Sequence, residues 1–352
     1  MIFPTHILFR DIIRLPQILY FTKEKPYNVT YYKYNYQYIM TNNHPKISVI
    51  IPLYNKAPYI KRTLDSVLNQ TMQDFEVIVV NDGSKDGGEK IVEGYDDPRI
   101  CLISQENQGV SAARNHGVEI AKSNQVAFLD ADDEWLPDFL EKMLELHLRY
   151  PHAVLYSCSS IDSSSKSILG YKESKFGIIN DYFRYCALHG HPINCSSVLI
   201  HKQTLQNIGG FNPEFKFYED LDLWDRLAYI GNVAHIDVPL SIYHTEASHD
   251  LKRIENCENN FKIPFLDFIH NISEEDLLRR DDLQDICLYL DYLKILEAKI
   301  TTYHNRAKSI SIIMSVHSRE LIVKKYKVLL YLLFPNRFKK PLMQIYNRCF
   351  GY

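Results

Sequence analysis

The stretch Val126-Ala-Phe-Leu-Asp-Ala-Asp-Asp133 joins an apolar run directly to a cluster of acids. The apolar half is typical of a strand buried in a sheet that is covered on both faces. The acids that follow it are Asp130, Asp132 and Asp133. In open α/β sheets, ligands bind where strands end, and clustered carboxylates suit Mg²⁺ or Mn²⁺ shared with a phosphate. The sequence therefore predicts an α/β fold with a divalent-cation site at the end of this strand.

A simpler interpretation is that Asp132 or Asp133 caps a helix that begins near Pro137. A cap needs one acid, whereas this stretch supplies three. The ligand interpretation is therefore the stronger one.

The chain around this stretch alternates between strand and helix patterns from Lys46 onward. This alternation predicts a mostly parallel central sheet with right-handed crossovers and flanking helices. A Ser-rich segment, 157–167, has the composition of a loop. Beyond about residue 250 the pattern is helical. The expected strands are 47–51, 75–80, 100–103, 126–129, 153–156, 196–200, 233–236 and 240–243, and the expected helices are 57–70, 109–121, 136–150, one from about 181, and 219–229.

Composition narrows the class of protein. The 352 residues are 46% hydrophobic and 24% charged, with a formal net charge of −3, as in ordinary globular proteins. This balance favours no nucleic-acid partner. The seven cysteines are scattered without a CxxC pair, which indicates reduced thiols in the cytoplasm. No apolar run reaches the roughly 20 residues of a spanning helix, and the first forty residues do not have the pattern of an export signal.

Three regions are expected: a Tyr-rich arm at 1–45, a catalytic domain at 46–250 and a helical region at 251–352. The segment 319–352 carries eight Lys or Arg against one Glu, interleaved with apolar residues. A basic amphipathic tail of this kind is typical of peripheral contact with the inner face of the cell membrane. The same pattern is equally typical of a solvated basic face on a packed helix.

Further candidate residues follow other expected strands or begin helices. Asp82, in the turn Asn81-Asp-Gly-Ser84, is suited to accept a base N–H or a ribose hydroxyl. Arg114 is suited to meet a phosphate or brace the acids, or equally to form an internal ion pair in tight helix–sheet packing. Asp220, at a helix start beside Glu219, is a candidate general base, although such acids often serve as caps.

Taken together and in this order, the motifs resemble the family 2 glycosyltransferases with the GT-A fold. The resemblance covers about 46–245 and leaves out the arm and the last hundred residues. The motifs are Pro52-Leu-Tyr-Asn55, Asn81-Asp-Gly-Ser84, Gln108-Gly-Val-Ser-Ala-Ala-Arg-Asn115, Leu129-Asp-Ala-Asp-Asp133, Gly209-Gly-Phe211 and Glu219-Asp220.

The resemblance implies a role for each matching position. Asp130 and Asp132 would hold Mn²⁺ or Mg²⁺ on the donor diphosphate, with Asp133 as an adjacent candidate. Asp220 would be the catalytic base, and the segment 191–197 would face the donor sugar and the acceptor. The nucleotide-sugar-binding residues would be Pro52, Tyr54, Asn55, Asp82, Gly109, Arg114, Asp130 and Ala131.

One position departs from the family pattern. His244 follows Tyr243, where many family members have an arginine. We include His244 as a candidate metal ligand.

The function implied is an inverting transfer of a sugar from a nucleotide-diphosphate donor, with UDP as the expected nucleotide. The acceptor would be a glycan or a lipid-linked glycan in surface-polysaccharide biosynthesis. An alternative is a non-catalytic nucleotide-binding scaffold of a glycan-assembly complex. A nucleotidyltransferase is a further alternative, but it would show a Gly-rich basic loop after the first strand, where this chain has Pro52-Leu-Tyr-Asn-Lys56.

Overall fold

The computed structural model describes residues 44–172, 176–245, 265–301, 306–321, 324–325 and 328–329. The Tyr-rich arm and most of the basic tail, with the membrane contact predicted for it, lie outside the described residues. Within the described part of the chain, no helix is both long enough and apolar enough to span a bilayer.

The first half of the sheet is parallel, in the order β3-β2-β1-β4. Its crossovers are helices, as the alternating pattern predicts. The strands and helices of this half are β1 (Ile47–Leu53), α2 (Ala57–Leu68), β2 (Phe75–Asn81), α3 (Gly88–Glu93), β3 (Ile100–Ser104), α4 (Val110–Ile120) and β4 (Gln125–Phe128).

The second half of the sheet is mixed. Strand β9 pairs antiparallel with both β4 and β6, so β6 and its parallel neighbour β10 run in the same direction as β4. The shorter strands β5, β7 and β8 are antiparallel to their partners. The elements of this half are β5 (Glu134–Trp135), α5 (Phe139–Arg149), β6 (Ala153–Asp162), β7 (Ile168–Leu169), β8 (Phe176–Ile179), α6 (Tyr182–His189), β9 (Val198–His201), α7 (Lys202–Asn207), α8 (Glu219–Ile230) and β10 (Asn232–Tyr243). The α/β fold class is confirmed.

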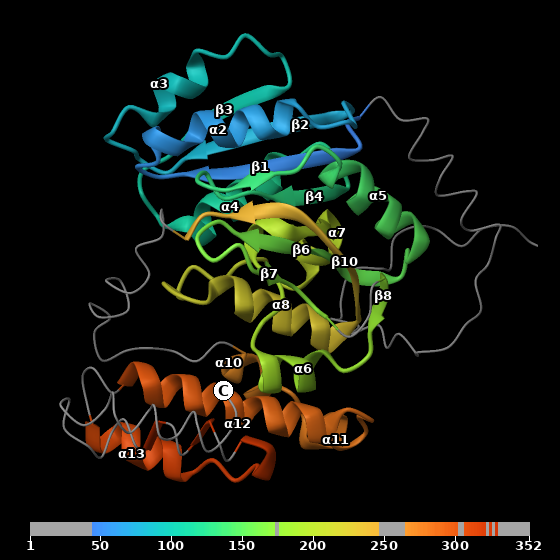
Figure 1. The fold of residues 1–352 in the computed structure, drawn as a ribbon, viewed down its shortest axis with the longest axis vertical. Helices are drawn as coiled ribbons and strands as arrows, with labels where there is room; N and C mark the ends of the chain where they lie inside the picture. The colour runs from blue at the N-terminus through green and yellow to red at the C-terminus, as the bar shows by residue number, and fades with distance from the viewer. Residues whose placement is uncertain are drawn as a thin grey trace, which may run out of the picture.

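Helices cover both faces of the sheet because the side chains of β1 alternate between two cores. Val49 and Ile51 pack with α2 and α5, whereas Ile50 packs with α4, α6 and α8. The C-terminal helices lie beyond α6 and α8, on the side away from β3 (Figure 1). They are α10 (Leu266–His270), α11 (Glu274–Leu278), α12 (Leu283–Thr301) and α13 (Arg306–Met314).

Residues 157–162 of the Ser-rich segment expected to be a loop are instead the second half of β6, whereas 163–167 form the expected loop, which leads to β7. Ser157, Ser159 and Ser160 are buried between β6 and β10, and each hydroxyl has a hydrogen-bond partner there. Ser157 Oγ lies 2.9 Å from Nδ1 of His235, for example. Composition misled the prediction because buried hydroxyls paired across strands behave as small core residues.

Gly117 allows α4 to lie directly on β1. A Cβ at this position would lie 2.5 Å from Cγ2 of Ile50, which is fully buried. We expect Gly117→Ala to lower the free energy of unfolding by about 1–3 kcal/mol because it overpacks the core. The expected sign is unusual, because replacing glycine with alanine in a helix interior normally stabilises the helix. Urea unfolding measures it.

A double-mutant cycle supplies the control. In an Ile50→Ala background the clashing atoms are absent, so Gly117→Ala should cost much less there. Equal costs in the two backgrounds would contradict the steric explanation.

Candidate functional site

One pocket of about 940 Å³ lies where the parallel strands end. It collects residues that are far apart in the sequence, from the turn after β1 to the end of β10. All of the residues predicted for the site line it: Pro52, Tyr54, Asn55, Asp82, Gly109, Arg114, Asp130, Ala131, Asp132, Asp133, Asp220 and His244.

Asp82 anchors a loop at one end of this pocket. Its carboxylate accepts hydrogen bonds from Gln105 Nε2 at 2.9 Å and from the backbone N–H groups of Gln108 at 2.9 Å and Gly109 at 2.8 Å. The carboxylate thus fixes the segment that opens α4. Tyr54, nearby in the pocket lining, is 47% exposed and offers a ring face to a ligand.

Arg114 connects two acidic segments of the pocket. Its guanidinium donates to Asp130 Oδ1 at 2.7 Å and to Glu219 Oε1 at 3.0 Å, while its side chain is only 3% exposed. The guanidinium also lies over the ring of Phe211, 5.1 Å from its centroid. These contacts agree both with bracing of the acids by Arg114 and with an internal ion pair in tight helix–sheet packing, two of the alternatives that the sequence left open.

Asp132 pairs with Lys56, whose ammonium donates to Asp132 Oδ2. Burial raises the pKa of Asp132, and the neighbouring charge of Asp130 raises it further, while Lys56 opposes both effects. The pKa of Asp132 is therefore raised mainly because burial penalises its charged form, since Lys56 more than offsets the repulsion from Asp130.

Asp133 faces a different set of partners. It is 1% exposed, its Oδ1 accepts the backbone N–H of His244 at 2.9 Å, and its Oδ2 accepts the Ser196 hydroxyl. The His244 ring lies with Nε2 2.7 Å from Glu134 Oε1. Both residues line the pocket. Through these contacts Asp133 links the end of β10 and the segment before β9 to the acid loop, residues 130–133.

Helix α2 holds the backbone of the acid loop from the opposite side. Thr63 donates to the carbonyl oxygens of Ala131 and Asp133, and Arg62 donates to that of Asp132 at 2.6 Å. Among the described residues, no three His, Cys, Asp or Glu side chains are placed to hold a metal ion by themselves.

Asp220 lies at the first turn of α8, where its Oδ1 accepts the N–H of Leu221 at 2.9 Å. Burial raises the pKa of Asp220 to about 7, and the adjacent charge of Glu219 adds to the rise while Arg114 opposes it. A carboxyl with a pKa near neutrality is suited to take a proton at physiological pH.

The structure adds pocket residues that the sequence did not single out. Lys56 follows the predicted Asn55 but has no motif of its own. Lys216, Phe217 and Tyr218 precede α8 and line the pocket, and Tyr218 has a φ of 58°. No local pattern indicates these contacts, because they depend on how α8 meets the ends of β1 and β4.

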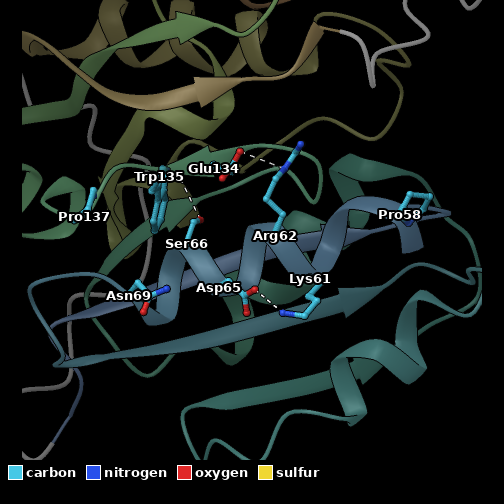
Figure 2. Close-up of a pocket in the computed structure, with 9 residues that line it drawn as sticks. All are labelled: Pro58, Lys61, Arg62, Asp65, Ser66, Asn69, Glu134, Trp135 and Pro137. Atoms are coloured by element: carbon cyan, nitrogen blue, oxygen red, sulfur yellow. Dashed lines mark hydrogen bonds and ion pairs between the residues drawn. The ribbon is translucent and has the colours of Figure 1, made fainter.

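A second, more open hollow of about 530 Å³ lies along α2 and β5. Figure 2 shows Arg62 reaching toward Glu134, 3.3 Å between Nε and Oε1, and Lys61 turned to Asp65. None of the predicted site residues lines this hollow.

Comparison with known proteins agrees with the geometry. The family model described as "Glycosyl transferase family 2" matches residues 48–200. A putative teichuronic acid biosynthesis glycosyltransferase, TuaG of Bacillus subtilis, is 36% identical over 200 residues, which cover 56% of this chain and 77% of TuaG. An uncharacterised glycosyltransferase of Rickettsia felis is 30% identical over 247 residues, or 68% of this chain, but the match spans only 40% of that relative.

Among solved structures, S. aureus TarS 1-349 in complex with UDP-GlcNAc superposes with a TM-score of 0.56 at 18% sequence identity, covering 82% of this chain and 80% of TarS 1-349. At this identity the likeness shows the fold alone. It confirms the expected GT-A architecture, and the match to TuaG confirms the family. The chain belongs to glycosyl transferase family 2.

Proposed function

We propose that this protein transfers a sugar from a nucleoside-diphosphate donor, with a UDP-sugar as the first candidate, to a glycan or lipid-linked acceptor in surface-polysaccharide biosynthesis. The observation that carries the proposal is the convergence of Asp82, Asp130, Asp132 and Asp220 on one pocket. The names of relatives such as TuaG support the pathway.

The donor would lie along the pocket from the Asp82 end toward Asp220. Tyr54 and the loop anchored by Asp82 are placed to contact the nucleoside. TarS 1-349, which shares the fold, forms a complex with UDP-GlcNAc, and this supports a UDP-sugar as the first donor to test.

A divalent cation fits the acid loop. Asp130 and Asp132 would hold it. Asp133 also lines the pocket, but it is almost fully buried and both of its carboxylate oxygens already accept hydrogen bonds, from His244 and Ser196. Mg²⁺ and Mn²⁺ commonly use one or two carboxylates and complete their coordination with substrate phosphates. A site at Asp130 and Asp132 would therefore need the donor phosphates to complete the metal coordination. When bound, the cation would neutralise charge on the departing nucleoside diphosphate.

Asp220 is the proposed base for the acceptor hydroxyl. Deprotonation by a single carboxylate is consistent with one in-line displacement and inversion at the anomeric carbon. Arg114 would hold the carboxylates of Asp130 and Glu219 in place, and Lys56 would hold Asp132 until the donor and cation bind.

Calorimetric titration with UDP, GDP and CDP, each with Mn²⁺ and with EDTA, tests the donor site. We expect one nucleotide to bind tightly only with the metal. Asp132→Ala should reduce its affinity to the level measured in EDTA, because a cation ligand is lost.

Asp138→Ala is the matched control, since Asp138 lies a few residues away and does not line the pocket. It should bind like the wild type. Full metal-dependent affinity in the Asp132 variant would refute the cation assignment, and no binding of any nucleotide to the wild type would refute the donor site.

The raised pKa of Asp220 predicts a pH dependence of transfer. A base acts only when deprotonated, so kcat/KM should rise with pH, reach half its maximum near pH 7 and then level off. Asp220→Asn should lower kcat by about 10²–10⁴-fold, the usual contribution of general acid–base catalysis.

Nucleotide affinity measured over the same pH range serves as the control, because Asp220 is not assigned to nucleotide binding. A flat kcat/KM profile between pH 6 and 8, or near-normal turnover by Asp220→Asn, would exclude Asp220 as the base.

A further inference from the structure

A chain of buried polar side chains connects the pocket wall to the C-terminal helices. His191 lines the pocket, and its Nε2 lies 2.6 Å from the hydroxyl of Tyr289 on α12. Tyr289 in turn donates to Asp225 Oδ2 on α8 at 2.6 Å, and Tyr182 on α6 donates to Asp225 Oδ1 at 3.3 Å. Residues from three helices and the pocket wall thus share one network.

The hydrogen bonds of Tyr289 set the His191 tautomer. When Asp225 is ionised, Tyr289 donates to it and the Tyr289 oxygen accepts from His191, so Nε2 carries the proton. Burial raises the pKa of Asp225 well above its ordinary value, and a protonated Asp225 would reverse both bonds, so either state of Asp225 selects a single tautomer. Nδ1 faces Cys186 Sγ at 3.8 Å, where a thiol can donate weakly. Burial lowers the pKa of His191 to about 3, which keeps the ring neutral at physiological pH.

The network is enclosed rather than solvated. Tyr289 and Asp225 are both 0% exposed, and the Tyr289 ring packs against Phe183 and Phe265, with centroids 5.6 and 6.1 Å away. In such surroundings a polar group without its partner is costly, so the hydrogen bonds strongly define one arrangement.

The segment of the pocket wall that starts at His191 continues to contacts with the acid loop. From His191 the chain passes through Asn194 and Cys195, which also line the pocket, to Ser196. The Ser196 hydroxyl accepts the N–H of Asp130 at 3.1 Å and donates to Asp133. A shift at His191 would therefore be transmitted to the residues proposed to face the donor sugar.

We propose that Tyr289 is a positioning residue of the pocket: together with Asp225, it holds His191 and thereby the wall from His191 to Ser196. The C-terminal helix α12, which lies beyond the match to the family model at 48–200, is then part of the catalytic unit. This inference rests on the proposed function.

The experiment compares Tyr289→Phe with Tyr292→Phe, using the full chain. Tyr292 lies three residues further along α12, and its ring packs against Tyr289 with centroids 6.0 Å apart. It does not line the pocket, and its hydroxyl makes none of the hydrogen bonds described for the network, so its variant controls for loss of a tyrosine hydroxyl from this helix. Nitrogen-15 NMR of histidine-labelled protein, with His191 assigned through His191→Asn, reports the tautomer. Calorimetry with UDP and Mn²⁺, and transfer kinetics, report function.

In the wild type and in Tyr292→Phe, we expect His191 as a single tautomer, the same in both proteins. In Tyr289→Phe we expect mixed tautomers and a kcat about 10-fold lower or more, because small misplacements of reacting groups are costly. Its affinity for UDP should stay within about twofold, since Asp82 and Tyr54 lie away from the network. This split between kcat and nucleotide affinity distinguishes positioning from general destabilisation.

Mixed His191 tautomers in the wild type, or a Tyr289→Phe protein that matches Tyr292→Phe in tautomer and kcat, would overturn the inference while the proposed function stands. Failure of the wild type to bind any nucleotide would overturn the proposed function, and the inference with it. The NMR result on the free protein separates the two failures, because it needs neither donor nor acceptor.

Discussion

The geometry of the candidate site depends on the two ion pairs of the buried Arg114 guanidinium. It comes from α4 and binds Asp130 at the end of β4 and Glu219 at the start of α8, so it fixes the angle at which these three elements meet. Removing one partner from a buried ion pair costs several kcal/mol, because the remaining charges are left uncompensated.

Arg114 cannot neutralise all of the acids that it gathers. Asp132 and Asp220 also lie in the pocket, and burial together with neighbouring negative charge raises the pKa of each. Lys56 relieves Asp132 only in part. Acids that are only partly neutralised in this way favour the binding of a cation. This agrees with the proposal that a cation binds here together with an anionic diphosphate.

The fold could be predicted largely from the sequence, because the apolar runs and helical periods that define β1, β2, β4 and α2 are local. The clustering of the candidate site residues in one pocket could be predicted too, since polar residues follow these strands. The different contacts of Asp130, Asp132 and Asp133 could not be predicted. They depend on Ser196 and on the backbone of His244, which are distant in sequence. Lys56 and the buried serines of β6 were missed for the same reason.

The dependence on distant partners also bears on how much of the chain is needed to form the candidate site. Asp222, on the helix that begins with Glu219 and Asp220, accepts the N–H of Phe265 at 3.1 Å through Oδ1 and binds Arg226 through Oδ2. One turn later, Asp225 accepts from Tyr289. These two buried carboxylates of α8 are thus satisfied in part by residues beyond 264. Since an unpaired buried carboxyl group is costly, α8 and its Asp220, the proposed base, need the C-terminal helices to keep their position.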